Sequence, residues 1–238
     1  MQNGLATVFF EKSESHSKAS VMDLKTLKNL VRQGEGTRLE FKLKTNHPEK
    51  IVREMVAFAN TEGGTLLVGV GDDKTISGLK FIDEDEYILV RAIEKYCYPP
   101  LPYCLERVAI SDTRDVLVFQ IAKSTNRTHG ILLENEENPK VYVRVADRSV
   151  QASKEVRQIL KRENEQGGIK FVYGQKEQIL MQYLEENQKI TVDKFTEIAQ
   201  IPRWLASRTL VLLSLAHVIK VEPHEVMDWF VLAVSREG

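Results

Sequence analysis

The sequence is poor in cysteine, in net charge and in long apolar runs, and each shortage excludes a class of protein. The two cysteines, Cys97 and Cys104, are too few for a disulfide framework, and no histidine stands at zinc-ligand spacing from them. We therefore expect two buried, reduced thiols. The formal charge of -1 and a pI near 6.6 give no overall attraction to nucleic acid, so any basic surface must be local.

Signals for export and for membrane insertion are also missing. No segment approaches the ~18 uninterrupted apolar residues that a membrane-spanning helix needs. The short apolar run over residues 6–10 is followed at once by Glu11 and Glu14, whereas a secretory signal has a basic start and a longer apolar stretch. These features predict a cytoplasmic protein without a membrane partner.

What the sequence does contain is enough apolar material for a core. Of its 238 residues, 42% are hydrophobic and 28% are charged, which is ordinary for a globular protein and leaves room for two modest domains. We expect an N-terminal arm over residues 1–20, a first domain over 21–166 and a second domain over 172–238. The break at Gly167-Gly168 marks the boundary.

Hydrophobic periodicity predicts a mixture of helices and strands in the first domain. Helical spacing covers residues 22–32, 48–60, 84–96 and 153–163, and strands are expected at 65–70, 104–110, 116–121 and 141–145. Residues 38–44 alternate, so we expect Leu39, Phe41 and Leu43 to face the core while Glu40 and Lys42 lie on a charged open face.

The second domain has three short helical stretches, near residues 179–184, 192–198 and 203–215. Two apolar segments at 218–221 and 229–234 then predict a hairpin. Three short helices followed by a hairpin is the element order of a winged helix.

Three ordered motifs carry a family resemblance. They are Glu35-Gly-Thr-Arg-Leu-Glu40-Phe-Lys42, the run Ala57-Phe-Ala-Asn60-Thr61-Glu-Gly63-Gly64, and Gly69-Val-Gly-Asp72. Together they resemble the AlbA-type domain of Schlafen and related bacterial proteins, and residues 141–145 with 152–153 resemble its closing strand and final helix start. The resemblance covers residues 24–160. It implies a mixed-sheet AlbA-type Schlafen domain. Combined with the element order of the second domain, this predicts an α+β fold in which the Schlafen domain is followed by a winged-helix-like domain.

One function that the resemblance implies is a metal-dependent endoribonuclease. In the animal Schlafens that cut RNA, two glutamates and an aspartate at these motif positions form the active site; here they are Glu35, Glu40 and Asp72. Clustered carboxylates are compatible when Mg²⁺ or Mn²⁺ lies between them, and the ion activates water. The competing interpretation is an ordinary charged strand face followed by turn aspartates.

The function that we favour is nucleic-acid binding without catalysis, because many bacterial relatives are described as DNA-binding transcriptional regulators. Residues 22–54 are mildly basic, with eight basic residues against five acidic ones, and Lys42 and Lys44 are candidate phosphate contacts there. On the expected recognition helix, Arg203, Ser207 and Arg208 should face outwards, and Arg203 and Arg208 are candidate contacts to DNA, which we expect more than RNA.

Other interpretations stay open at this point. From residue 174 onwards acidic residues outnumber basic ones, nine to seven, so the second domain also suits dimerisation or protein docking without nucleic acid. A homo-oligomer is compatible with that alternative. The Gly-rich turn over residues 60–64 follows a helix, whereas phosphate loops precede helices, so we interpret it as a structural turn. His47 and His129 are expected to be loop residues without metal.

Overall fold

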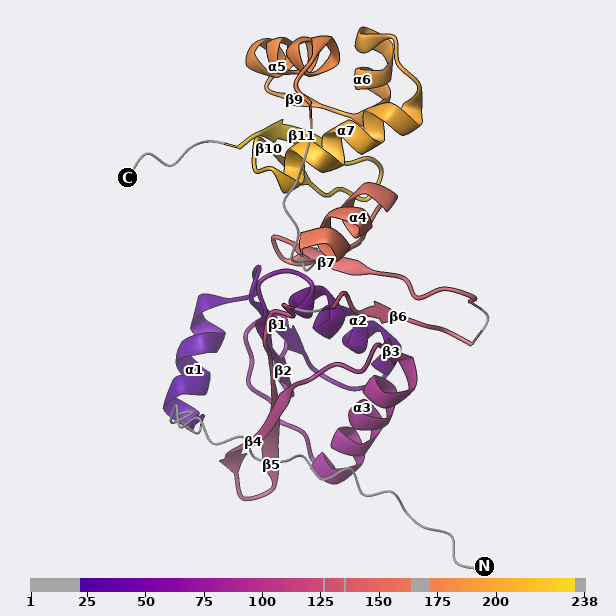
Figure 1. Ribbon diagram of the computed structural model, residues 1–238. Helices are drawn as coiled ribbons and strands as arrows, with labels where there is room; N and C mark the ends of the chain where they lie inside the picture. Colours follow the sequence, from indigo (N-terminus) through magenta and orange to yellow (C-terminus); the bar gives the residue numbers. More distant parts are fainter. Residues whose placement is uncertain (1–21, 126, 135, 164–171, 234–238) are drawn as a thin grey trace, which may run out of the picture.

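The computed structural model describes residues 22–125, 127–134, 136–163 and 172–233 (Figure 1). The arm predicted over residues 1–20 and the boundary at Gly167-Gly168 lie outside these residues. Within them the chain forms an α+β fold, in which a first part with a mixed sheet is followed by a C-terminal module from residue 172 onwards. The predicted α+β class with a mixed sheet is confirmed.

The first part contains the predicted elements in the predicted order, together with a few short strands. Its helices are α1 (Leu24–Gln33), α2 (Pro48–Ala59), α3 (Ile82–Tyr96) and α4 (Lys154–Glu163). Its strands are β1 (Leu39–Lys42), β2 (Gly64–Val68), β3 (Cys97–Tyr98), β4 (Cys104–Ser111), β5 (Arg114–Ile121), β6 (Gly130–Ile131), β7 (Tyr142–Val145) and β8 (Arg148–Gln151). The additional strands β3 and β6 have two residues each, which is too short to give a periodic pattern, and β8 is a further strand that was not predicted.

Local sequence signals explain where the helices begin. The side chain of Asp23 caps α1 by accepting a hydrogen bond of 2.8 Å from the backbone nitrogen of Thr26. Pro48 is the first residue of α2, where its missing N–H would have had no helical partner anyway. The same helix ends at Ala59 with Asn60 as its C-cap, close to the end that the Gly63-Gly64 pair predicts.

The main sheet has the strand order β1-β2-β5-β4. The β1–β2 pair is parallel, while β2–β5 and β5–β4 are antiparallel, so the sheet is mixed as expected. Helix α1 covers one face of this sheet, and α2 and α3 cover the other (Figure 1). Because β2 lies between β1 and β5 with helices on both sides, its continuous apolar sequence is fully explained.

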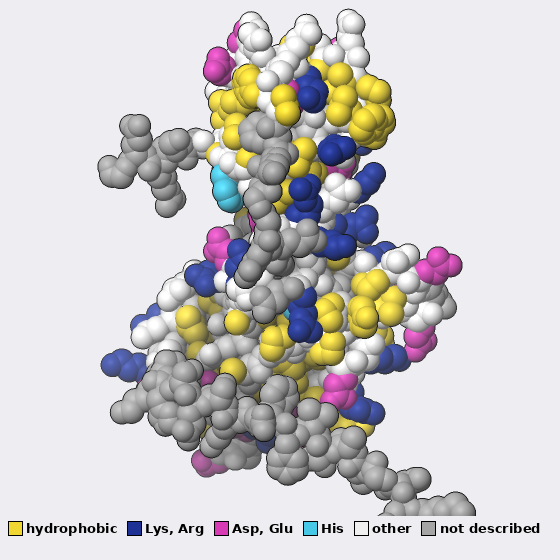
Figure 2. Space-filling model, in the orientation of Figure 1, with side chains coloured by type: hydrophobic (Ala, Val, Ile, Leu, Met, Phe, Trp, Pro, Cys, Tyr) yellow, Lys and Arg dark blue, Asp and Glu magenta, His cyan; other side chains and the backbone are white. Residues whose placement is uncertain are grey.

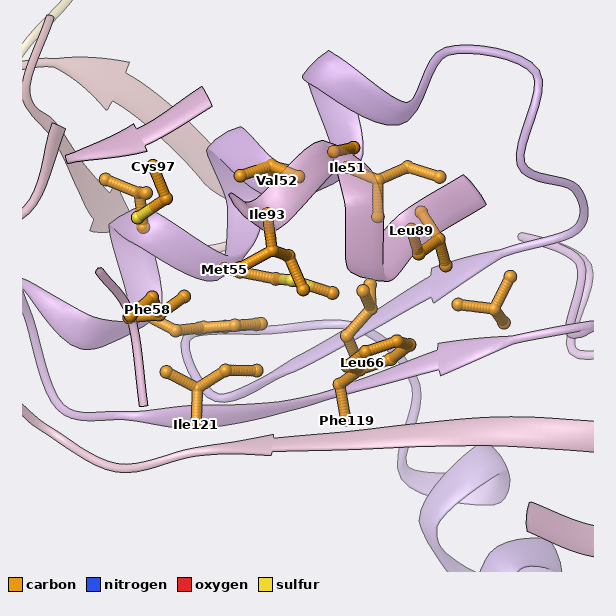
Figure 3. Close-up of a cluster of buried hydrophobic side chains, with 14 of the residues drawn as sticks. Ile51, Val52, Met55, Phe58, Leu66, Leu89, Ile93, Cys97, Phe119 and Ile121 are labelled. Atoms are coloured by element: carbon orange, nitrogen blue, oxygen red, sulfur yellow. The ribbon is translucent and has the colours of Figure 1, made fainter. Parts of the chain in front are cut away.

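Each face of the sheet has its own apolar core. On the α2–α3 face, Met55 and Phe58 of α2 and Ile93 of α3 pack against Leu66 and Phe119 of the sheet (Figure 3). Burying one such side chain fully contributes roughly 1.5–3 kcal/mol. On the opposite face, residues of α1 and the sheet form a second cluster, which includes Leu27, Phe41, Leu67 and Val118.

The strand register decides where Glu40 points. Glu40 is paired with Leu66 in the β1–β2 ladder, and paired residues share a face of the sheet. Since Leu66 packs under α2, Glu40 does too, and only 6% of its surface is exposed. The prediction of an open, solvated face is therefore wrong for Glu40, because α2 covers it. Leu43, predicted to face the core, lies beyond the end of β1 and is 45% exposed.

The C-terminal module contains the three predicted helices and the hairpin. They are α5 (Gln175–Asn187), α6 (Val192–Ala199), α7 (Arg203–Leu215), β10 (Ile219–Glu222) and β11 (Trp229–Leu232). An unpredicted short strand, β9 (Lys189–Ile190), pairs with β11, so the sheet order is β10-β11-β9. This element order is the one expected of a winged helix, and membership of that class stays a prediction.

Helix α4 joins the two parts by packing into both. Its residue Ile159 belongs to the core of the C-terminal module, together with Leu180 and Leu210. Its residue Val156 packs instead with Val143 of β7 in a small separate cluster. Helix α4 therefore lies against α7 of the C-terminal module (Figure 1). Among the described residues, no helix has the length and apolarity that a membrane span requires.

The two cysteines differ in exposure. Burial raises the pKa of the Cys97 thiol to about 12, so this group stays protonated. Cys104 is exposed, because it begins β4 at the edge of the sheet. The expectation of two buried thiols is confirmed for Cys97 and wrong for Cys104.

Candidate functional site

The first and third motifs meet at the ends of β1 and β2. Glu35 lies in the connection before β1, and its Oε1 accepts a hydrogen bond of 2.8 Å from the backbone nitrogen of Phe41. Asp72 follows β2 in a turn that is attached to β1, because the backbone nitrogen of Gly69 donates to the carbonyl of Lys42 at 2.7 Å. Both acidic side chains are exposed.

Neighbouring charges of the first and third motifs act on the pKa of Glu35. Desolvation is the largest cause that raises this pKa above its ordinary value of 4.5, and the negative charges of Glu40 and Asp72 raise it further. The hydrogen bond from Phe41 and the positive charge of Lys42 act in the opposite direction. The structure thus brings the predicted acidic residues into one region.

Glu40 itself is already neutralised by two cations of the chain. Its Oε1 pairs with the ammonium of Lys42, and its Oε2 pairs with the guanidinium of Arg144. The sequence did not indicate Arg144, which lies in β7, far from β1 along the chain. Since both oxygens of Glu40 have a cationic partner, neither is free to bind a divalent ion in this arrangement.

Arg144 is the centre of a buried network that joins several segments. Its side chain has no exposed surface, and its NH1 donates to Glu54 of α2 at 2.7 Å. Its Nε and NH2 donate to the carbonyl of Gly36 at 3.2 and 3.0 Å, and its guanidinium lies 5.0 Å from the ring centre of Phe58. Ser149 of β8 also donates to Glu54. Most donors of the guanidinium therefore have an acceptor, as a buried arginine requires.

Residues of the second motif form hydrogen bonds to the segments that surround this network. The hydroxyl of Thr61 donates to the carbonyl of Ala57 at 2.8 Å and accepts from the backbone nitrogen of Arg144 at 2.9 Å. The amide of Asn60 donates to the carbonyls of His129 and Tyr142 at 2.8 and 2.9 Å. The polar residues of the motif thus attach β7 and the His129 segment to the end of α2.

The two glycines of this motif allow close packing, as predicted. A Cβ on Gly63 would stand 2.6 Å from the carbonyl oxygen of Ile121, and its φ of +74° disfavours any other residue. A Cβ on Gly64 would stand 2.5 Å from the Phe58 ring, which itself lies under Arg144. The interpretation of the turn as structural agrees with these contacts.

The arrangement does not fit a shared Mg²⁺ or Mn²⁺ ion. Among the described residues, no group of three His, Cys, Asp or Glu side chains is placed to hold a metal ion. One oxygen of Glu35 accepts a backbone hydrogen bond, and both oxygens of Glu40 are paired with cations. The catalytic roles of Glu35, Glu40 and Asp72 stay predictions, and the contacts seen here are those of a structural cluster.

The predicted nucleic-acid contacts differ in their exposure and in their ion pairs. Lys44 is exposed, whereas Lys42 is paired with Glu40. On α7, Arg208 is exposed, and Arg203 forms an ion pair with Asp193 of α6. No ion pair joins Lys44 or Arg208 to another described residue.

Ser207 does not lie on the outward face of α7, where we expected it. It is only 6% exposed, and its hydroxyl donates to Glu155 of α4 at 2.5 Å. The reason is that α4 lies against this side of α7, a tertiary contact that the periodicity of α7 alone does not reveal.

His129 is a loop histidine as predicted, but it is fully buried. Its Nδ1 lies 2.9 Å from the carbonyl oxygen of Pro99, and its Nε2 lies 2.7 Å from the hydroxyl of Ser124. Desolvation is the largest cause that lowers its pKa below 6.5, so the ring is neutral at pH 7. His47 is exposed at the start of α2.

Comparison with known proteins assigns the first part to a family. Residues 35–153, which make up half of the chain, match the family described as Schlafen, AlbA_2, and the chain belongs to this family. A solved structure that is similar to part of the chain is the DIP2311 protein from Corynebacterium diphtheriae. The sequence identity is 18% and the TM-score is 0.37, and the match covers 58% of this chain but only 32% of that one.

Proposed function

We propose that this protein binds nucleic acid, and that it acts as a DNA-binding transcriptional regulator. Membership of the Schlafen AlbA_2 family is consistent with nucleic-acid binding. The observation that carries the proposal is a local basic surface on a chain whose net charge is only -1. Lysine and arginine side chains gather where α4 meets α7 (Figure 2).

The proposed binding surface includes the junction between the two parts of the chain. Helix α4 packs into the core of the C-terminal module as well as against the Schlafen domain. The basic surface between them is therefore built from both parts, with Arg208 on the C-terminal side. Lys44 is a second exposed candidate contact, on the Schlafen domain. The proposed nucleic-acid contacts therefore lie on both parts of the chain.

Fluorescence anisotropy with labelled DNA, both as duplex and as single strand, tests the proposal. We expect binding whose affinity falls steeply as salt rises, because each cation–phosphate contact releases counterions. The single changes Lys44→Ala and Arg208→Ala should each weaken binding and reduce the slope of log K against log salt by about 1. Arg91→Ala is the matched control, because Arg91 is an exposed arginine on α3 that pairs with Glu94.

The result that contradicts the proposal is the absence of binding to DNA and to RNA at low salt. If that absence is accompanied by a stable oligomer in sedimentation, the interaction-module alternative replaces it. The nuclease alternative has its own signature in the same samples. Labelled RNA would be cut on addition of Mg²⁺ or Mn²⁺, and Asp72→Asn, a change in an exposed turn, would abolish the cutting.

A further inference from the structure

The basic surface between α4 and α7 is a groove of about 460 Å³. Helix α4 contributes Lys154, Lys161 and Arg162 to its lining, and α7 contributes Trp204 and Arg208. Its volume lies within the range of about 300–1,000 Å³ that is typical of small-ligand sites. The groove is thus comparable in size to a site for one nucleotide unit rather than for a whole duplex.

The cations of α4 lie on one face because of their spacing. Lys154 and Lys161 are seven residues apart, which is close to two helical turns, and both are exposed. The opposite side of the helix carries Val156 and Ile159, which are buried in the apolar clusters. No described residue forms an ion pair with the groove cations. They are therefore available to a ligand with several negative charges.

On the side that faces α4, helix α7 cannot enter a DNA major groove by itself. Ser207 is buried against Glu155 of α4, and Arg203 is held by Asp193 of α6. A recognition helix needs its outer face clear of its own protein. Ligands that approach here meet α4 and α7 together.

Trp204 gives the groove a feature that phosphate binding alone does not need. It lies on the first turn of α7, and 62% of its surface is exposed, although tryptophan is usually among the well-buried residues. An exposed aromatic ring beside a row of cations is the combination by which proteins hold single strands: the base stacks on the ring and the cations follow the phosphates. In a duplex both faces of each base are already stacked, so the ring has no base to cover.

We infer that the α4–α7 groove binds single-stranded nucleic acid, with an unpaired base stacked on Trp204 and the neighbouring phosphates on Lys154, Lys161, Arg162 and Arg208. This inference rests on the proposed nucleic-acid binding and narrows its ligand. It does not depend on the regulator role or on the contact at Lys44.

Tryptophan fluorescence during titration with an unlabelled oligo-dT strand is the direct test. The chain has two tryptophans, and Trp229, on β11, is the internal control. We expect quenching in the parent protein and in Trp229→Phe, because stacking on Trp204 changes its emission. In Trp204→Phe the quenching should disappear while the affinity is largely kept, since phenylalanine still offers a ring for stacking.

Affinities measured by anisotropy with the labelled strand complete the test. Trp204→Ala should weaken binding by about 5- to 100-fold, because base stacking is lost. Lys161→Ala should weaken it in a salt-dependent manner, while Lys80→Ala, an exposed lysine outside the groove, should not. Trp204 and Lys161 are exposed, so these variants should keep the parent thermal stability.

The outcomes separate this inference from the proposed function. If the parent protein binds DNA but Trp204→Ala and Lys161→Ala bind as the parent does, the groove inference is overturned and the proposed function stands. Tighter binding of duplex than of single strand, with unchanged tryptophan emission, also overturns the inference alone. If neither form of nucleic acid binds, both are overturned.

Discussion

At the scale of single residues, the molecule is organised around Arg144. The side chain is fully buried, and it bonds to Glu40 of β1, to Glu54 of α2 and to the carbonyl of Gly36. Each of these groups alone would be costly to bury. Together they hold β1, α2 and β7 in fixed relation. The first motif, residues 35–42, therefore contributes to the stability of the fold.

Replacing Arg144 tests that role. Arg144→Met keeps most of the volume but leaves Glu40 and Glu54 buried without their shared cation, so we expect a loss of about 3–5 kcal/mol in the free energy of unfolding. Urea denaturation followed by circular dichroism measures it. Arg148→Met is the matched control on the neighbouring strand, because Arg148 is 59% exposed, and it should stay within about 0.5 kcal/mol of the parent.

A second variant shows whether the loss comes from the uncompensated charges. Adding Glu40→Gln and Glu54→Gln to Arg144→Met should recover part of the lost stability, because neutral amides cost less to bury than carboxylates. A single Arg144→Met protein as stable as the parent would refute the structural role.

Sequence reasoning found Glu40 of this network but missed its partners. Glu35, Glu40 and Asp72 were identified because they lie in ordered motifs. Arg144 was placed only in the expected closing strand, without a role, and Glu54 was not singled out. A usable signal was present for Glu54, since it occurs beside Met55 and between Ile51 and Phe58 on an apolar helix, where a carboxylate needs a partner. Its partner is distant along the chain, and only the fold shows which cation it is.

At the scale of elements, the turn from α2 into β2 positions the network. Asn60 and Thr61 attach the end of α2 to the segments at His129 and Arg144, and Gly63 lets β2 approach the end of β5. The sequence predicted this turn correctly, because glycine pairs after a helix are strong local signals. Which segments the turn attaches depends on tertiary contacts.

Glycine replacement gives a prediction for this turn. Gly63→Ala should lower the free energy of unfolding by about 1–3 kcal/mol, because φ is +74° and the new Cβ would meet the carbonyl oxygen of Ile121. Gly36→Ala is the control, since a Cβ there has no atom within 4 Å and the carbonyl to Arg144 is kept. Thermal denaturation of the two variants measures this difference. Equal melting temperatures would contradict the need for glycine at position 63.

The helices and strands themselves were largely predictable, but their surroundings were not. Strand alternation placed Glu40 opposite Leu39 and Phe41 correctly, yet it did not show that α2 covers the second face of β1. The same limit applies to α7, whose outer side is covered by α4 at Ser207. Periodicity indicates which residues share a face, and only packing shows which faces meet solvent.

At the scale of the whole molecule, charge is distributed unevenly despite the near-zero total. In the Schlafen domain the motif cations are used internally, as Lys42 and Arg144 are by Glu40. At the junction with the C-terminal module, lysine and arginine side chains gather (Figure 2), and those of α4 line a groove together with Arg208. We therefore expect the motif charges to maintain the fold and the junction to meet the ligand.

The motif charges are thus assigned to the fold and the junction to ligand binding. Hydrogen–deuterium exchange with and without a bound oligonucleotide tests this assignment most directly, because it locates the ligand on the unmodified protein. We predict slower exchange in peptides from α4 and from the first half of α7, where a bound strand suppresses local opening. Peptides covering residues 35–42 and 70–75 should exchange at unchanged rates. Protection confined to those two motif segments, with α4 and α7 unaffected, would contradict the account.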